Sequence, residues 1–184
     1  MRLDPGEHTL GPPSATVRLR TYRQGIASKA GHDLVLEAAS WHGTIVVPEE
    51  PGAPPSVTAE IDLRSLFVVA GSGGVKPLTD GDKDDIRAAM QKPLRTGDHP
   101  TATFRSTEVR VGGDQAAILG ELTLAGQTHP VELEVRREGD GTVVGHAEIV
   151  QSTWGIKPYT GFLGALKLRD AVDVDVDVAV PLQV

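Results

Sequence analysis

The sequence contains no cysteine, and this absence excludes several kinds of chemistry. Without thiols the chain forms no disulfide bond, holds no metal ion through thiolate ligands and has no cysteine nucleophile. Aromatic residues are also scarce, with three Phe, two Trp and two Tyr among 184 residues. An interior lined mainly by smaller Val and Ala side chains leaves space unfilled, which favours a cavity.

Long apolar runs and basic runs are missing as well. No segment approaches the roughly 18–20 apolar residues that a spanning helix needs, so no membrane span is predicted. The first residues, MRLDPGEHTLGPPSA, lack the apolar region of a secretory signal. The chain as given is therefore expected in the cytoplasm, or in the periplasm or outside the cell if a signal was removed. A formal net charge of -7 gives no electrostatic reason to bind nucleic acid.

Glycine and proline, in contrast, are plentiful, at 21 and 13 residues. This composition is typical of short strands joined by tight turns. Alternation of apolar and polar residues predicts about eight strands, of which 33–47 reads as one long bent strand or two short ones. The predicted strands are residues 15–22, 33–47, 57–63, 101–111, 116–124, 130–137, 142–151 and 171–180.

Several residues within this pattern predict bulges and turns. Gly43 is expected at a bulge or at a close approach of two backbones, and a slip in the alternation near Thr107 predicts another bulge. Gly112-Gly113-Asp114 predicts a hairpin turn, and Ala125-Gly126-Gln127 predicts the next. Short hairpins join antiparallel strands, so these turns argue against a parallel sheet.

One segment, residues 80–91, has the character of a helix. Asp80 or Asp82 is expected to cap its start, and Pro93 is expected to end it. Ile86, Ala89 and Met90 fall on one helical face. The preceding residues 71–77 are predicted to form a loop.

These elements predict a single all-β domain over residues 1–184. Its expected form is an eight-stranded antiparallel β-barrel, closed because closure removes exposed sheet edges, with one short helix inserted between strands 3 and 4. A sandwich of two sheets is the alternative. Eight strands make about the smallest barrel with room for a small ligand.

Several blocks of the sequence resemble the YceI-like family of bacterial lipocalin-like barrels. Ala15–Val17 and Gly43–Ile45 match its first two strands. His99–Ser106 matches its YP-x-x-x-F-x-S block, and Gly120–Val131 matches its G-x-L-T-L-x-G-x-T-x-P-V hairpin. The helix departs from the family's R-D-x-H-L motif, with Lys83–Arg87 at that place. The resemblance covers nearly the whole chain.

The resemblance implies an eight-stranded barrel whose cavity binds a polyisoprenoid chain, such as the tail of an isoprenoid quinone. A related amphiphilic lipid, such as a fatty-acid derivative, is also compatible with it. It implies no catalysis and no cofactor.

Apolar stripes on the predicted strands, together with the helix and nearby aromatic residues, form the candidate ligand-binding set. The alternative is a filled core without a cavity. His32 is a candidate polar contact for a ligand headgroup, and the residues near the barrel mouth are candidates to line or gate the cavity. The full set is Val17, Leu19, His32, Leu34, Ile61, Leu63, Ile86, Met90, Phe104, Leu122, Leu124, Val131, Leu133, Trp154, Phe162, Leu163, Val174 and Val176.

No metal site is predicted. Asp173, Asp175 and Asp177 lie on one face of one strand, but their side chains are spaced about 7 Å apart, too far to share one ion. A solvated outer face is expected for them instead.

Two other functions remain open. An enzyme acting on an apolar substrate would use His32 with Asp33, or Tyr159 with Lys157, although adjacent strand residues such as His32 and Asp33 point to opposite faces. A non-catalytic interaction module of the stress response, dimeric and with a filled barrel, is the other alternative. A filled interior beside an exposed apolar patch would favour the module.

Overall fold

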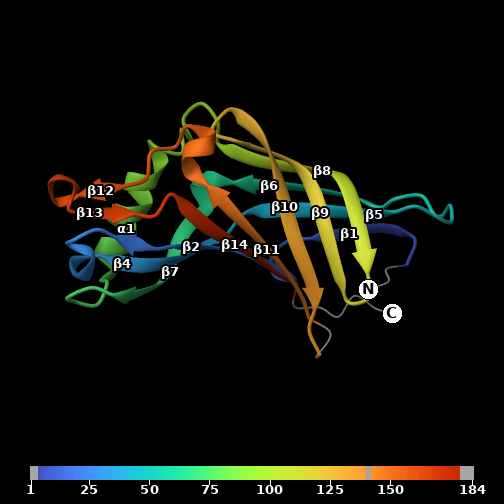
Figure 1. Cartoon of the computed structure of the whole chain (residues 1–184), viewed down its shortest axis with the longest axis horizontal. Helices are drawn as coiled ribbons and strands as arrows, with labels where there is room; N and C mark the ends of the chain where they lie inside the picture. The colour runs from blue at the N-terminus through green and yellow to red at the C-terminus, as the bar shows by residue number, and fades with distance from the viewer. Residues whose placement is uncertain (1–3, 140–141, 179–184) are drawn as a thin grey trace.

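A computed structural model describes residues 4–139 and 142–178, apart from the side chain of Phe162. Eleven antiparallel strands form one long curled sheet (Figure 1). In hydrogen-bonded order they are β1 (Gly6–Leu10), β5 (Trp41–Val47), β6 (Ser56–Asp62), β8 (Thr101–Gly112), β9 (Gln115–Leu124), β10 (Gln127–Arg137), β11 (Val143–Val150), β14 (Ala171–Val178), β2 (Ala15–Thr21), β4 (His32–Ala38) and β7 (Leu66–Gly73).

The predicted eight-stranded closed barrel was wrong in strand number and in closure. The additional strands are β1, β7 and the division of 33–47 into β4 and β5. β1 and β7 end the pairing order, and no pairing within the described ranges joins them. β1 was missed because it is short and mostly exposed, and β7 because its run of Leu66–Ala70 does not alternate.

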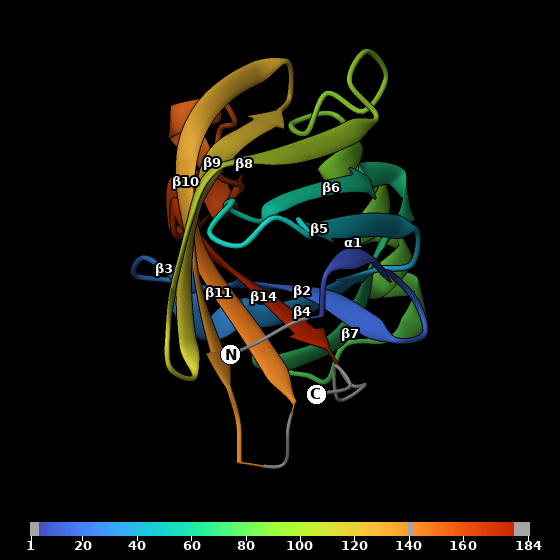
Figure 2. The same cartoon turned by 90° about the vertical axis from the view of Figure 1, so that its right-hand side faces the viewer.

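Sharp bends in three chain segments give the sheet its curl. The bends lie between β1 and β2, between β4 and β5, and at η2 (Leu63–Ser65) between β6 and β7. The strands on one side of these bends, β1, β5 and β6, pair in that order and continue into β8. The strands on the other side, β2, β4 and β7, pair in that order and follow β14. The two flanks of the sheet are therefore joined through the chain itself, and Figure 2 shows the sheet bent around an inner face.

In the two sequence blocks that resemble the family, His99–Ser106 and Gly120–Val131, glycines allow neighbouring segments to pack closely. A β-carbon on Gly120 would lie 2.4 Å from the Phe104 ring and 2.5 Å from the Arg105 carbonyl oxygen. At the β9–β10 turn, Ala125 and Gly126 both have positive φ (50° and 82°), as a two-residue hairpin turn requires. A β-carbon on Gly126 would meet the His99 ring. The blocks containing His99 and Gly120 are thus packed against each other.

Irregularities in the strands agree in part with expectation. The ladder between β8 and β9 shifts register between Ser106 and Glu108, which confirms the bulge near Thr107. Gly43 keeps a regular register with Ala59, and its added β-carbon would lie 3.3 Å from the Thr58 carbonyl oxygen, so it marks a close approach rather than a bulge. A bulge that was not predicted lies at Val35 and Leu36.

The helix α1 spans Asp80–Gln91, the residues expected to be helical. It lies between β6 and β8, which correspond to the third and fourth predicted strands, but β7, which was not predicted, also lies in that interval. The cap is Thr79, which forms a reciprocal capping box with Asp82. Ile86 and Met90 pack on the buried residues of β4 and β7, whereas Ala89 is exposed.

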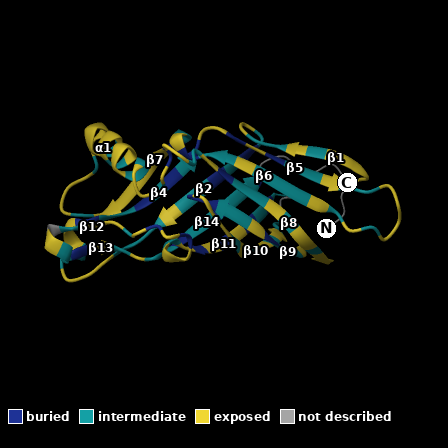
Figure 3. Ribbon diagram, turned by 90° about the horizontal axis from the view of Figure 1, so that it is seen from above, coloured by how far each residue is buried: buried dark blue, intermediate teal, exposed yellow. Residues whose placement is uncertain are grey.

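A small second sheet lies at the same end of the molecule as α1. It comprises β12 (Thr160–Gly161), β13 (Leu166–Leu168) and β3 (Arg23–Gln24), with the short helical turns η1 (Ser28–Ala30), η3 (Gln151–Trp154) and η4 (Phe162–Gly164) nearby. Figure 3 shows buried residues concentrated along the middle of the large sheet and exposed ones at its ends.

Candidate ligand-binding interior

The predicted apolar stripes converge on the inner face of the curled sheet. Val17 lies opposite Val176 and Leu19 opposite Val174 in the ladder between β2 and β14. Across the sheet, Leu122 lies opposite Phe104 on one side and opposite His129 on the other. Opposite residues of paired strands share a face, so alternation carries these stripes to a common interior.

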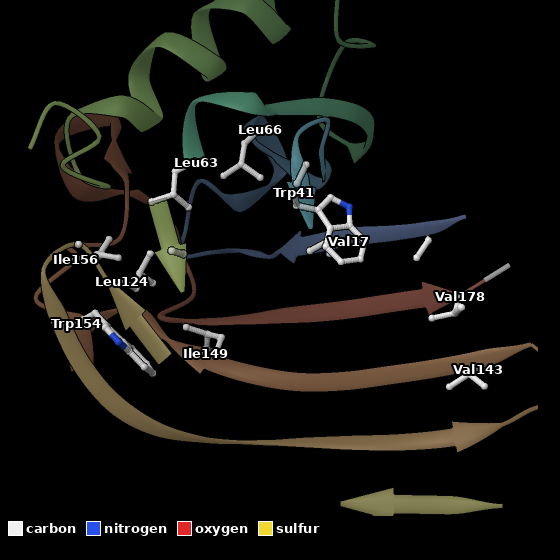
Figure 4. Close-up of a cluster of buried hydrophobic side chains, with 14 residues drawn as sticks. Val17, Trp41, Leu63, Leu66, Leu124, Val143, Ile149, Trp154, Ile156 and Val178 are labelled. Atoms are coloured by element: carbon white, nitrogen blue, oxygen red, sulfur yellow. The ribbon is translucent and has the colours of Figure 1, made fainter. Parts of the chain in front are cut away.

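Some of the predicted residues are buried in this interior. All but Leu34 belong to one cluster that continues across β2, β5, β9, β11 and β14, of which Figure 4 shows the side chains, and Leu34 lies in a second cluster with Leu36 and Val68. Leu124, Ile149, Trp154 and Ile156 gather at one end of it. The predicted residues that are buried are Val17, Leu34, Leu63, Leu124 and Trp154.

Other predicted residues face the same interior but are only partly buried. Val174 and Val176 lie on β14, between β11 and β2, and Leu122 lies on β9, between β8 and β10. Each of these strands has a paired neighbour at both of its edges, so the exposed part of these inward-pointing side chains lies on the inner face of the sheet. These side chains pack against the buried cluster while keeping part of their own surface exposed. The partly buried members of the predicted set are Leu19, His32, Ile61, Ile86, Met90, Phe104, Leu122, Val131, Leu133, Val174 and Val176.

Two predictions fall outside this interior. Leu163 is fully exposed in η4, so it lies apart from the converging set. The prediction for Phe162 concerns a side chain outside the described part of the structure.

Trp154 closes one side of the interior in a fixed orientation. Its Nε1 donates a hydrogen bond to the Leu122 carbonyl at 3.1 Å. Its ring packs edge-on against His129, with ring centroids 5.3 Å apart. Trp154 is thus a rigid wall element, with its polar atom already satisfied.

Trp41 is an interior residue that sequence reasoning missed. Its side chain is 8% exposed and lies in the buried cluster, yet its Nε1 has no hydrogen-bond partner among the described residues. The Oγ1 of Thr21 is likewise buried without a partner. Buried donors are nearly always paired, so this unpaired one is a candidate contact for a ligand that displaces the side chains over it. Alternation could have identified Trp41, because residues two apart on a strand share a face and Gly43 faces inward.

The His32–Asp33 pair considered for catalysis is not assembled. His32 Nε2 donates to the Lys76 carbonyl at 2.7 Å, whereas Asp33 accepts from the Arg23 backbone N–H at 2.8 Å. His32 and Asp33 therefore have separate partners. Tyr159 is mostly exposed.

The acidic residues of β14 form a charged ladder on the outer face. Arg18 bonds Asp177 at 2.6 Å and Glu37 at 2.8 Å, and these carboxylates raise the pKa of Arg18, Glu37 most strongly. Tyr22 donates to Asp173, and that hydrogen bond raises the pKa of Tyr22.

Asp175 differs from the solvated residue that was expected, because it is only 8% exposed. Arg20 from β2 and His146 from β11 cover it, at 3.2 Å and 3.0 Å. The expectation of a fully solvated face was wrong here, since neighbouring strands bring long side chains over this carboxylate. Within residues 4–139 and 142–178, no cluster of three His, Asp or Glu side chains could hold a metal ion.

A family model described as the YceI-like domain matches residues 14–180. The chain belongs to the YceI-like family. That match spans the inner face, Trp41 and the charged ladder alike. No helix among the described residues is long and apolar enough to cross a membrane.

Curated YceI-like relatives align with part of the chain. Protein YceI of Escherichia coli O157:H7 is 42% identical over 95 residues, which cover 47% of this chain and 44% of that protein. A UPF0312 protein of Pseudomonas aeruginosa is 41% identical over 95 residues, with the same coverage. The alignments thus span less than half the length of these relatives.

Two solved structures share the fold over most of the chain. BcnA of Burkholderia cenocepacia superposes with a TM-score of 0.59 at 18% identity, covering 89% of this chain and 94% of that one. The Campylobacter jejuni YCEI protein gives a TM-score of 0.50 at 15% identity, covering 78% and 81%. At such identities the likeness concerns the fold alone.

Proposed function

We propose that this YceI-like protein binds and carries an isoprenoid lipid, or a similar amphiphile, against the inner face of its curled sheet. The observation that supports this most is the partial exposure of inward-facing Leu122, Val174 and Val176. Apolar side chains in the middle of a sheet that remain accessible on the inner face offer a surface that an apolar ligand can cover.

Hydrophobic burial is strong enough to hold such a ligand. Each isoprene unit resembles a leucine side chain in size, so its burial contributes about 2 kcal/mol. Several units together exceed the cost of ordering a flexible tail, which subtracts part of the gain. The length of the buried tail, rather than any polar contact, would set most of the affinity.

Trp41 supplies one polar contact for the headgroup. Its unpaired Nε1–H can donate to a single acceptor, such as the carbonyl oxygen of a quinone. A hydrogen bond there would offset the cost of leaving this donor buried. A lipid with one polar atom next to a long apolar tail fits this arrangement.

The same features favour carriage over catalysis. The His32–Asp33 pair has separate partners, and its two residues face opposite sides of β4. The interior offers apolar walls and isolated donors, which can bind and release a lipid without changing it. An interaction module with a filled barrel is less compatible with the accessible inner face.

Lipid extraction tests this proposal. The purified protein and a control protein are extracted with organic solvent, and the extracts are compared by mass spectrometry. We expect a near-stoichiometric isoprenoid or acyl compound from this protein alone. A clean extract, together with no uptake of added quinone or polyprenyl lipid, would exclude the carrier function and favour the interaction module.

Substitutions on β9 make the test specific to the inner face. Leu122→Trp occupies space that the lipid would fill, so we expect a loss of about 1.4 kcal/mol or more of binding free energy, which is roughly a tenfold or larger loss of lipid affinity. Glu121→Trp adds the same side chain on the outer face of the same strand and should bind lipid normally. Equal binding by both variants would place the lipid elsewhere.

A further inference from the structure

Two loops come together at the end of the molecule that carries α1. Residues 22–31 and 155–169 are joined by pairing of Gln24 with Lys167 and by a hydrogen bond from the Ala27 N–H to the Ala165 carbonyl at 3.0 Å. We call these two segments the tip. In Figure 1 the tip lies around β12 and β13, at the opposite end from the loop between β5 and β6.

Two large aliphatic side chains protrude from the tip. Ile26 is 96% exposed and Leu163 is 110% exposed, and both line one shallow surface hollow together with Gly164. Leu163 has φ of 55°, a conformation that bulky residues rarely adopt. Exposed apolar side chains gathered at one place mark an interaction surface, and strained backbone is typical of functional loops.

The tip is basic although the chain as a whole is acidic. It holds five basic residues and no Asp or Glu, against a net charge of -7 for the whole protein. None of the ion pairs formed in the described ranges involves Lys29, Lys157 or Lys167, and all three are exposed. The other two bases are engaged, since Arg23 pairs with Asp33 and Arg169 lies over the Tyr22 ring.

Acidic groups near the tip do not cancel this charge. Asp33 pairs with Arg23, and Asp170 directly follows the tip and keeps its negative charge, but these two acids are outnumbered by the five basic residues of the tip. The first turn of α1 is also acidic, but α1 and the small sheet lie on opposite sides of this end of the molecule, as Figures 2 and 3 show. Lys167 lines the same hollow as Ile26 and Leu163, and Lys29 and Lys157 lie on the same two segments of the tip, which is therefore locally basic.

We propose that the tip docks this protein on the surface of an anionic lipid bilayer. Ile26 and Leu163 enter the interfacial region, while Lys29, Lys157 and Lys167 lie at the level of the anionic headgroups. A second copy of the chain fits this surface less well, because a symmetric contact would set lysines against lysines. Docking would bring the lipid-binding interior next to the membrane, but the tip acts through its own residues.

Vesicle co-sedimentation tests the docking. The protein is mixed with vesicles of phosphatidylcholine alone, or with vesicles that also contain phosphatidylglycerol. We expect binding to the anionic vesicles that weakens as salt is added. Each of the three lysines should contribute roughly fivefold, so Lys29→Gln, Lys157→Gln and Lys167→Gln together should remove most of the preference for anionic lipid.

Removal of the aliphatic side chains tests insertion separately. Ile26→Ser with Leu163→Ser should lower vesicle binding at least about tenfold, since each buried aliphatic side chain of this size contributes well over that factor at full depth. Val111→Ser is the matched control, because Val111 is 53% exposed outside the tip and should not alter binding. Circular dichroism establishes that each variant is folded.

Three outcomes would overturn the docking proposal. They are equal binding to neutral and anionic vesicles, binding unaffected by the Ile26 and Leu163 substitutions, and a dimer in sedimentation velocity that these substitutions abolish. The test is independent of lipid carriage, because the Leu122→Trp variant should still dock. Docking without recovered lipid, or lipid without docking, therefore identifies which of the two proposals fails.

Discussion

A substitution at Trp41 is expected to lower the affinity for a lipid headgroup without lowering the stability of the protein. Trp41→Phe keeps an aromatic ring in the cluster and removes the unpaired Nε1–H. A hydrogen bond contributes about 1 kcal/mol, so we expect about fivefold weaker binding of an isoprenoid quinone. Stability of the lipid-free protein should be unchanged or slightly higher, because a buried donor without a partner is lost.

The comparison ligand for this experiment is a hydrocarbon of equal length without a headgroup. Its affinity should be the same for the native protein and for Trp41→Phe, as measured by fluorescence competition with an apolar dye. A fivefold loss for the hydrocarbon as well would mean that Trp41 acts through packing alone.

Period-two alternation predicted part of the inward-facing set, although Trp41 was missed. It placed Val17, Leu19, Val174 and Val176 on one face, and the ladder between β2 and β14 puts them there. It could not predict the burial of Asp175, because burial depends on side chains from two strands far away in the sequence, those of Arg20 and His146. Exposure of Leu163 is equally a matter of loop placement, which alternation does not describe.

At the scale of single elements, the start of α1 carries a pH-dependent contribution to stability. Thr79 donates to the Asp82 carboxylate through its hydroxyl and its backbone N–H, and these hydrogen bonds lower the pKa of Asp82 below its ordinary value of 3.8. A carboxylate with a lowered pKa in the folded state stabilises it above the unfolded-state pKa. That contribution is lost as the pH falls through the folded-state value.

Asp82→Ala should therefore destabilise α1 at neutral pH, and its difference from the native protein should shrink below about pH 4. Urea unfolding and amide hydrogen exchange in α1, followed from pH 7 downward, measure this difference. Asp84→Ala is the control, since the Asp84 carboxylate makes no hydrogen bond or ion pair within the described part of the chain. A difference for Asp82→Ala that stays constant down to the acid transition would contradict the capping role.

Element boundaries show where local signals are sufficient. The helix over 80–91 was predicted correctly because acidic first-turn residues and apolar spacing are both local. The strands β1 and β7 were missed because they are edge strands, and edge strands need not alternate when only part of one face is covered. The division into β4 and β5 was one of two open readings, since a bend at Ala39 and Ser40 depends on packing against β6 and β7.

For the whole molecule, the curl of the sheet links ligand occupancy to stability. Strands from both flanks contribute side chains to the inner face, and α1 packs on Leu34, Leu36 and Val68 through Ile86 and Met90. A ligand on the accessible inner face would add contacts to several strands at once. It would therefore stabilise the whole sheet rather than one element.

Removal of bound lipid should accordingly lower the melting temperature. A ligand at a hundred times its Kd stabilises the folded state by about 2.7 kcal/mol, which corresponds to about 5–10 °C for a chain of this size. Calorimetry of the delipidated protein, with lipid added back in steps, measures the shift. The increase should saturate at one lipid per chain and be absent from Leu122→Trp, while Glu121→Trp should behave as the native protein. A melting temperature that rises equally in Leu122→Trp would mean that the lipid acts from the outside of the sheet, and the inner face would then be structural only.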